Sequence, residues 1–238
     1  MLEKKWILKP QPTAVELAEL KSAINASDIL ATLLVQRKIQ DFESARAYFN
    51  PSVDGLHNPF MMKDMDRAVN RISNAIEEGE NILIYGDYDV DGTSAVSLVY
   101  GFLLEQYDNI GYYIPDRYGE GYGVSYKGID FADDNGFSLV IALDCGVKAN
   151  DQIAYALDKK IEFIVCDHHL PSEELPMTTA MLNPLQKGCS YPYKYLSGCG
   201  IGFKLIQALS ISWDLEKEVA WKQLDLVAIA AACDIVPM

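Results

Sequence analysis

The pattern of hydrophobic and polar positions divides the chain at about residue 60. Before this point, three short segments have the apolar spacing of helices, with candidate caps at Asn25 or Ser27 and a stop at Pro51. These segments are residues 13–24, 27–38 and 41–49. They predict a small N-terminal helical cap over residues 1–60.

After residue 60 the pattern changes. Residues 65–79 are amphipathic and end at Gly79, which predicts a helix. Short apolar runs then alternate with helical stretches, which is typical of βαβ units and of a parallel sheet buried on both faces. The predicted strands lie in residues 81–86, 110–115, 138–146, 161–169 and 178–184, and the predicted helices in residues 92–106, 125–135 and 150–159. We therefore expect an α/β fold, with one long helix over residues 216–238 that stops at the sequence DIVP.

The composition is that of a globular protein. The chain has 238 residues, of which 50% are hydrophobic and 11% aromatic, and this excludes fibrous and disordered classes. Its five cysteines include no C-x-x-C pair, which argues against a disulfide framework or a zinc site and fits a reducing cytosol. No signal peptide is visible, and the longest apolar run, residues 226–233, is too short for a membrane span. These features predict a cytoplasmic protein with no membrane role.

The net charge of −14 counts against a nucleic-acid role, because phosphate contacts supply most of the affinity in such complexes, but it does not exclude one. Clustered carboxylates that hold divalent cations would account for part of the acidic excess.

Ionisable residues follow three of the predicted strands. They are Asp87, Asp89 and Asp91 after the first, Asp144 after the third, and Asp167, His168 and His169 after the fourth. A single aspartate at a strand end is commonly a helix cap or turn residue. Because ligands bind beyond the carboxyl ends of parallel strands, the three groups together indicate a functional site. Bound divalent metal would relieve the repulsion between their carboxylates.

Two other uses of the sequence DYDVDG fit less well. In a calcium-binding EF-hand loop, position 12 is Glu and the loop joins two helices, whereas here that position is Leu98 and a strand precedes the motif. The segment Asp89 to Thr93 also resembles the nucleophile motif of haloacid-dehalogenase-type phosphatases, but GDY separates it from its strand. The later lysine and paired acidic motif of that family are not found in matching positions.

Four motifs in order, GDYDVDG, LDCG, CDHHLP and ACDIVP, resemble those of the DHH phosphoesterase superfamily and, more narrowly, of the RecJ-like single-strand-specific exonucleases. The segments PDRYGEGYGVS and LSGCGIGFKL add to this resemblance. It implies a DHH-type catalytic domain over residues 61–238. Members of the family continue into a DHHA1-like domain and usually an oligonucleotide-binding fold, which are absent here, so we expect this chain to be an N-terminal fragment.

The resemblance also implies residue roles. The implied metal ligands are Asp87, Asp89, Asp91, Asp144, His168 and Asp234, and the implied catalytic residues are His169, Asp144 and Asp167. Asp144 would bridge two ions, His169 would face the scissile phosphate, and Asp167 would orient a histidine. Carboxylates with one imidazole favour two Mn²⁺ or Mg²⁺ ions over zinc.

The expected function is 5′-to-3′ hydrolysis of single-stranded DNA in repair and recombination. Arg117 would bind a terminal phosphate and Tyr118 or Tyr122 would stack on a base, although the same loop could be a simple flexible turn. Ser197 and Gly198 begin either a phosphate-binding helix or a closely packed one. A single-strand-binding protein or a helicase is a candidate partner. The alternatives are a DHH phosphodiesterase for cyclic dinucleotides, short oligonucleotides or pyrophosphate, and a non-catalytic DHH-fold scaffold. The sequence does not fix cleavage polarity, processivity or oligomeric state.

Overall fold

The computed structural model describes residues 5–237, and its chain forms two compact units that meet in sequence between Leu56 and His57. The domain boundary predicted at residue 60 stays a prediction. Among the described residues, no helix combines the length and the apolar character needed to cross a membrane.

The first unit consists of the three predicted short helices. They are α1 (Ala14–Ile24), α2 (Asp28–Val35) and α3 (Phe42–Phe49), followed by the single turn η1 (Val53–Gly55). Each helix starts at a side-chain cap: Thr13, Ser27 and Asp41 accept hydrogen bonds from backbone amides of the first turn. The buried apolar residues are few and small in total volume, so this unit has a minimal core; they are Leu20, Ala31, Leu34, Val35, Ile39 and Ala45.

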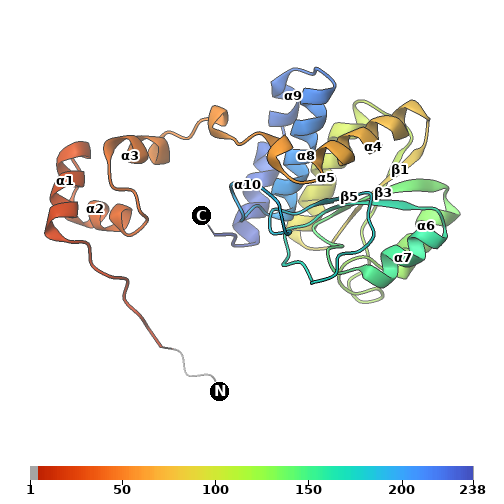
Figure 1. Ribbon diagram of the computed structural model, residues 1–238, viewed down its shortest axis with the longest axis horizontal. Helices are drawn as coiled ribbons and strands as arrows, with labels where there is room; N and C mark the ends of the chain where they lie inside the picture. Colours follow the sequence, from red (N-terminus) through yellow and green to blue (C-terminus); the bar gives the residue numbers. More distant parts are fainter. Residues whose placement is uncertain (1–4, 238) are drawn as a thin grey trace. The chain divides into compact units, whose positions relative to one another are not determined.

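The second unit is built on a five-stranded sheet whose neighbouring strands are all parallel (Figure 1). The strands are β1 (Asn81–Gly86), β2 (Ile110–Tyr113), β3 (Phe137–Leu143), β4 (Glu162–Cys166) and β5 (Ala180–Leu182). Their order in the sheet is β2-β1-β3-β4-β5. The predicted α/β fold with a parallel sheet is therefore confirmed.

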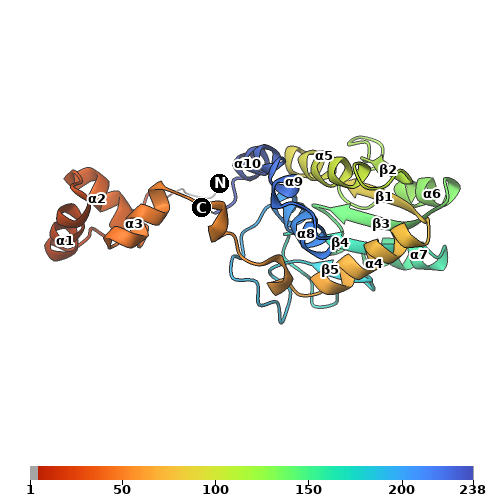
Figure 2. The same cartoon turned by 90° about the horizontal axis from the view of Figure 1, so that it is seen from above.

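Helices cover both faces of the sheet (Figures 1 and 2). One face carries α4 (Met65–Glu77), α5 (Val90–Leu104), α8 (Gly198–Ser212), α9 (Lys217–Trp221) and α10 (Leu224–Cys233), with the single turn η2 (Pro59–Met61) before α4. The other face carries α6 (Tyr126–Asp134) and α7 (Asn150–Asp158). Successive side chains of a strand point to opposite faces, so Ile82 and Ile84 join the larger core while Leu83 and Tyr85 join the smaller one.

The single long helix predicted for residues 216–238 is wrong, because the structure has two helices, α9 and α10, with a turn at Lys222 and Gln223. Neither turn residue is a helix breaker, so the break comes from packing. Val219 and Trp221 of α9 and Leu224 and Val227 of α10 all pack against the larger core. Two short helices bring both apolar sets onto that core, and the sequence pattern alone does not show the break between them.

The strand order creates a switch point at the carboxyl ends of β1 and β3. After β1 the chain crosses to β2 on one side, and the later strands β3, β4 and β5 extend the sheet on the other side. In open parallel sheets the crevice at such a point is where ligands bind. Asp87 follows β1 and Asp144 follows β3, so both aspartates lie at this crevice.

Candidate metal centre and active site

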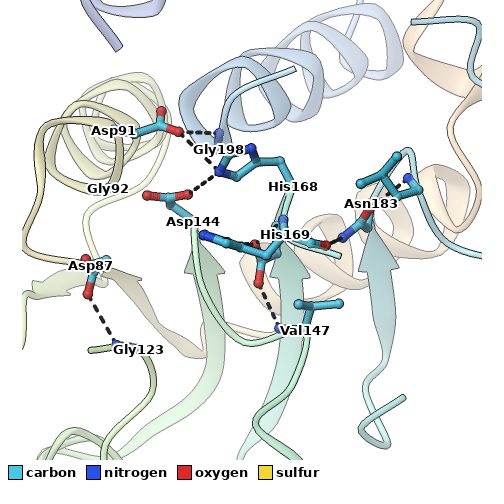
Figure 3. Close-up of polar contacts among 12 residues, drawn as sticks. Asp87, Asp91, Gly92, Gly123, Asp144, Val147, His168, His169, Asn183 and Gly198 are labelled. Atoms are coloured by element: carbon cyan, nitrogen blue, oxygen red, sulfur yellow. Dashed lines mark hydrogen bonds and ion pairs between the residues drawn. The ribbon is translucent and has the colours of Figure 1, made fainter. Parts of the chain in front are cut away.

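The turn between β1 and α5 carries the first three aspartates. Asp87 is buried, and its Oδ1 accepts a hydrogen bond from the Gly123 amide at 3.2 Å (Figure 3). Burial raises the pKa of its carboxyl group. Asp89 is exposed and caps α5, accepting from the Gly92 amide at 2.9 Å. A side chain at Gly92 would meet the Asp87 backbone oxygen at 2.6 Å, so only glycine fits this tight strand-to-helix turn.

Asp91 points away from its own helix to the start of α8. Its carboxylate accepts from the Gly198 amide at 2.6 Å and the Cys199 amide at 2.8 Å (Figure 3). These amides are unpaired donors of a helix N-terminus, and a carboxylate satisfies both their hydrogen bonds and the helix dipole. Burial nevertheless raises the pKa of Asp91. Asp91 therefore joins two helices that are far apart in sequence, in addition to facing the candidate metal site.

Asp144 occupies the switch point itself. Its backbone has a φ of 60°, a left-handed conformation that is uncommon outside glycine and turns the side chain into the crevice. Burial raises the pKa of its carboxyl group to about 7. Helix α8 approaches so closely that a Cβ on Gly198 would lie 2.5 Å from the Asp144 Cβ.

His168 lies among three carboxylates. Its Nε2 is 3.2 Å from Asp144 Oδ1, 3.7 Å from Asp234 Oδ2 and 3.8 Å from Asp91 Oδ2. Burial alone lowers the pKa of His168, but the neighbouring carboxylates outweigh it and raise the pKa to about 9. Asp234 reaches the cluster from the C-terminal cap of α10. The crevice thus gathers ligand-type atoms from four elements of the fold.

His169 is held by a different set of contacts. Its Nδ1 lies 2.7 Å from Asp167 Oδ1, while Asp167 Oδ2 accepts from the Val147 amide at 2.8 Å. Asn183 donates to the His169 carbonyl oxygen at 2.9 Å (Figure 3). Burial alone raises the pKa of Asp167, but the bonds and charge of His169 hold it below the usual value, and the same bond raises the pKa of His169. Asp167 therefore contacts His169 and not the cluster around His168, and its predicted role in orienting a histidine stays a prediction.

The loop between β2 and α6 places its three predicted substrate residues differently. The Arg117 guanidinium lies 5.1 Å from the centre of the Tyr88 ring, and Tyr118 is 95% exposed. Tyr122 points inward, with its hydroxyl 3.1 Å from His169 Nε2. The roles predicted for Arg117 and Tyr118 stay predictions.

Ser197 and Gly198 have partners within the protein. Ser197 caps α8 and accepts from the Gly200 amide at 3.1 Å, while the Gly198 amide donates to Asp91. Gly198 also allows the close approach of α8 to Asp144. This geometry favours close helix packing at this position, and the phosphate-binding role stays a prediction.

The cluster fits a divalent cation. There are two groups in which all the ligand atoms lie within 4.8 Å of one another. One consists of Asp144, His168 and His169, and the other of Asp91, His168 and Asp234. Asp87 Oδ2 is buried without a hydrogen-bond partner among the described residues, and the buried Asp144 Oδ1 and His168 Nε2 have only each other, at 3.2 Å. Buried polar atoms are normally paired, and carboxylate and imidazole atoms without donors suit a cation such as Mn²⁺ or Mg²⁺. Neither Asp87 nor Asp89 is in either group, and Asp89 Oδ1 is used by the helix cap.

The sequence did not reveal the residues that support the site residues through hydrogen bonds. The Gly123 amide on Asp87, the Asn183 amide on the His169 carbonyl oxygen and the Tyr122 hydroxyl on the His169 ring are contacts across long sequence separations. The Asn-Pro pair at residues 183 and 184 signals a turn but not its partner. Backbone donors carry no sequence signal at all.

Comparison with known proteins points in one direction. The family model described as "DHH family, N-terminal domain" matches residues 81–231. The single-stranded-DNA-specific exonuclease RecJ of Bacillus subtilis (strain 168) is 36% identical over 234 residues, which cover 98% of this chain. The chain spans only 29% of the length of that relative.

Solved structures agree with the fold. A crystal structure of exonuclease RecJ bound to manganese superposes with a TM-score of 0.68 at 27% identity, covering 74% of this chain and 44% of that one. RecJ of Thermus thermophilus, in complex with Mn²⁺, superposes with a TM-score of 0.77 and covers 95% of this chain and 31% of that one. At 21% identity this second likeness bears on the fold alone.

Proposed function

The chain belongs to the DHH family, and from that premise we propose that it holds two divalent cations, Mn²⁺ or Mg²⁺, and hydrolyses phosphodiester bonds of single-stranded DNA from the 5′ end. The observation that carries this proposal is the buried cluster of ligand atoms at the switch point, in which Asp144 Oδ1 lies 3.2 Å from His168 Nε2 and Asp87 Oδ2 has no hydrogen-bond partner among the described residues. Clustered carboxylates and an unpaired buried oxygen are destabilising unless a cation neutralises them.

The residues that would hold the ions are Asp87, Asp91, Asp144, His168 and Asp234. Among them, Asp144 and His168 share one group of closely spaced ligand atoms, and Asp91, His168 and Asp234 share the other. A pair of such ions, when bound, supplies a nucleophilic water at neutral pH and stabilises the charge of the phosphoryl oxygens. The carboxylates are held in fixed positions for the ions, because Asp87 and Asp91 accept hydrogen bonds from backbone amides and Asp144 is held by its turn.

His169 has the position of a proton donor or acceptor beside the cluster. Asp167 holds its Nδ1, so Nε2 is the nitrogen that faces the crevice. Hydrolysis joins the oxygen of water to phosphorus and breaks the bond to the leaving oxygen, which takes up a proton. His169 Nε2 would stabilise the phosphate oxygens and exchange that proton, with Asp167 stabilising the charged ring.

The substrate is supported by the relatives and by the exposed loop. The B. subtilis and Salmonella typhimurium relatives are single-stranded-DNA-specific exonucleases. Arg117 and Tyr118 offer a cation and an aromatic ring, which suit a terminal phosphate and an unpaired base. The cytoplasmic location remains part of the proposal, supported by five free cysteines in the described chain. A single-strand-binding protein or a helicase stays a predicted partner.

The test is incubation of the chain in Mn²⁺ with single-stranded DNA labelled at either end, with duplex DNA and with dinucleotides. We expect release of mononucleotides from the 5′ end of the single strand and loss of this activity in Asp144→Asn. Asp108→Asn is the matched control, because Asp108 precedes β2 at the opposite edge of the sheet. Cleavage of dinucleotides without cleavage of the strand would favour a small-substrate phosphodiesterase. Equal activity in Asp144→Asn and in the unchanged chain would contradict the proposed metal centre.

A further inference from the structure

A cavity of about 350 Å³ lies directly beside His169, on the side of the α7 face of the sheet. Its walls include Tyr122, Asp167 and His169, which belong to the site described above, and the segment from Cys145 to Ala149 that connects β3 to α7. The proposed catalytic histidine therefore forms part of the cavity wall. Its volume is at the lower end of the range for small-molecule sites, about 300–1,000 Å³.

The floor of the cavity is apolar. Val124, Cys145, Val147 and Ala149 are all buried and contribute to its lining. None of these side chains offers a strong hydrogen-bond donor or acceptor. A flat, weakly polar ring can be accommodated on such a floor, whereas a free sugar or an inorganic ion gains nothing from it.

Two polar side chains at the cavity have no hydrogen-bond or ion-pair partner among the described residues. They are the half-buried amide of Gln152, in the first turns of α7, and the exposed ammonium of Lys148. Most other polar groups around the site, such as Asp167 and Asn183, are fully engaged within the protein. An amide pairs with the donor and acceptor atoms on the edge of a nucleobase, and an ammonium pairs with a phosphate.

We propose that this cavity binds the nucleoside adjacent to the scissile phosphate, with the base on the apolar floor, its edge at Gln152 and, in a strand, the neighbouring phosphate near Lys148. The proposal rests on the function proposed above and adds a subsite to it. His169 and Tyr122 line the cavity, and the Tyr122 hydroxyl contacts Asp144, so one nucleotide can place its phosphate at the cluster and its base in the cavity. The chemical class of ligand is a nucleoside monophosphate or the equivalent unit of a strand.

The experiment compares two probes, thymidine 5′-monophosphate and inorganic phosphate, by calorimetric titration in saturating Mn²⁺. Both carry a phosphate for the metal centre, but only the nucleotide has a base for the cavity. We expect the unchanged chain to bind the nucleotide at least about tenfold more tightly than phosphate, as stacking and one hydrogen bond provide. Gln152→Ala is expected to weaken nucleotide binding by about threefold to tenfold. Ala149→Met, which fills the cavity, is expected to remove the preference for the nucleotide.

Gln106→Ala is the matched control, since Gln106 is an exposed amide at the end of α5 and outside the cavity. Equal affinity for the two probes in the unchanged chain would overturn the subsite, as would an unaltered preference in both cavity variants. A chain that cleaves single-stranded DNA but has no preference for the nucleotide refutes the subsite and leaves the proposed function standing. A chain that neither binds Mn²⁺ nor cleaves DNA refutes the proposed function, and the subsite falls with it.

Discussion

The hydroxyl of Tyr122 lies 3.1 Å from Nε2 of His169, and the same hydroxyl donates to the carbonyl oxygen of Asp144 at 3.2 Å. Tyr122 thus connects the histidine proposed for proton exchange to the backbone of the aspartate proposed to bridge the metals. Together with Asp167, which holds the other ring nitrogen, it leaves the His169 ring little freedom. The sequence suggested only a stacking role for this tyrosine, and the contact indicates that its hydroxyl matters as well.

Substitution at Tyr122 separates the stacking role of its ring from the positioning role of its hydroxyl. Tyr122→Phe keeps the ring and removes the hydroxyl, so we expect kcat to fall by about threefold to tenfold, equivalent to one hydrogen bond, with little change in KM. Tyr122→Leu removes the ring too and should also raise KM. Steady-state kinetics on a short single-stranded oligonucleotide measure both parameters, with Tyr118→Phe as the control for a general loss of a loop hydroxyl. An unchanged kcat in Tyr122→Phe would show that the hydroxyl does not position His169.

A second prediction concerns the two glycines that begin α8. Gly198→Ala would place its Cβ 2.5 Å from the Asp144 Cβ and 2.6 Å from Asp144 Oδ1, which forces α8 or Asp144 to move. We expect loss of stability of about 1–3 kcal/mol, as in overpacked cores, and weaker Mn²⁺ binding. Gly200→Ala is the control, because its Cβ would meet Leu196 at 3.4 Å, an ordinary contact, and alanine favours the helix.

Urea unfolding and Mn²⁺ titration of both variants check this prediction. Gly200→Ala should be neutral or slightly more stable than the unchanged chain. If Gly198→Ala binds Mn²⁺ as tightly as Gly200→Ala does, the close contact between α8 and Asp144 has no bearing on the metal centre.

The fold and the gathering of acidic and histidine side chains could be predicted from the sequence because both follow from local pattern. Buried strands are short apolar runs, and parallel strands bring their carboxyl ends to one edge, so Asp87, Asp144 and His168 were expected to meet. The double role of Asp91 was not predictable, since its partners are the amides of a helix more than a hundred residues away. The break between α9 and α10 was missed for the same reason: it depends on where the core lies, not on the residues at the break.

Protons and metal ions should compete for the candidate centre. Burial raises the pKa of Asp144 to about 7, so in the metal-free chain this carboxyl group is largely protonated below pH 7 and ionised above it. A metal ligand must be deprotonated, and Mn²⁺ binding therefore releases this proton at acidic pH. We expect the apparent Mn²⁺ affinity to fall with decreasing pH by up to about tenfold per pH unit for each ligand that must lose a proton, which is His168 below about pH 9 and also Asp144 below about pH 7. Titrations at pH 5.5, 6.5 and 7.5 check this, and an affinity that is constant across them would exclude Asp144 as a ligand.

The last prediction concerns Lys204, a buried lysine on α8 that is only 2% exposed. Its Nζ donates to the His57 carbonyl oxygen and to Gln207 Oε1, both at 2.9 Å, and the rings of Tyr191 and Phe203 lie close to it. Burial lowers the pKa of Lys204 from 10.5 to about 8. Between these two values the unfolded chain keeps the proton that the folded chain releases, so the free energy of unfolding should rise with pH. Below pH 8 the ammonium is charged in both states, and its burial penalty is present in full.

Lys204→Met removes this titration. Relative to this variant, the unchanged chain should gain up to about 1.4 kcal/mol of unfolding free energy for each pH unit between about 8 and 10.5. Urea unfolding at pH 7.5, 8.5 and 9.5 measures the difference, and Lys217→Met provides the control at an exposed lysine on α9. Taking the difference in unfolding free energy between the two chains at each pH cancels the titration of the other groups, because both chains contain those groups. A constant difference between the unchanged chain and Lys204→Met across this range would mean that the lysine stays charged in the folded protein, stabilised by its two oxygen partners.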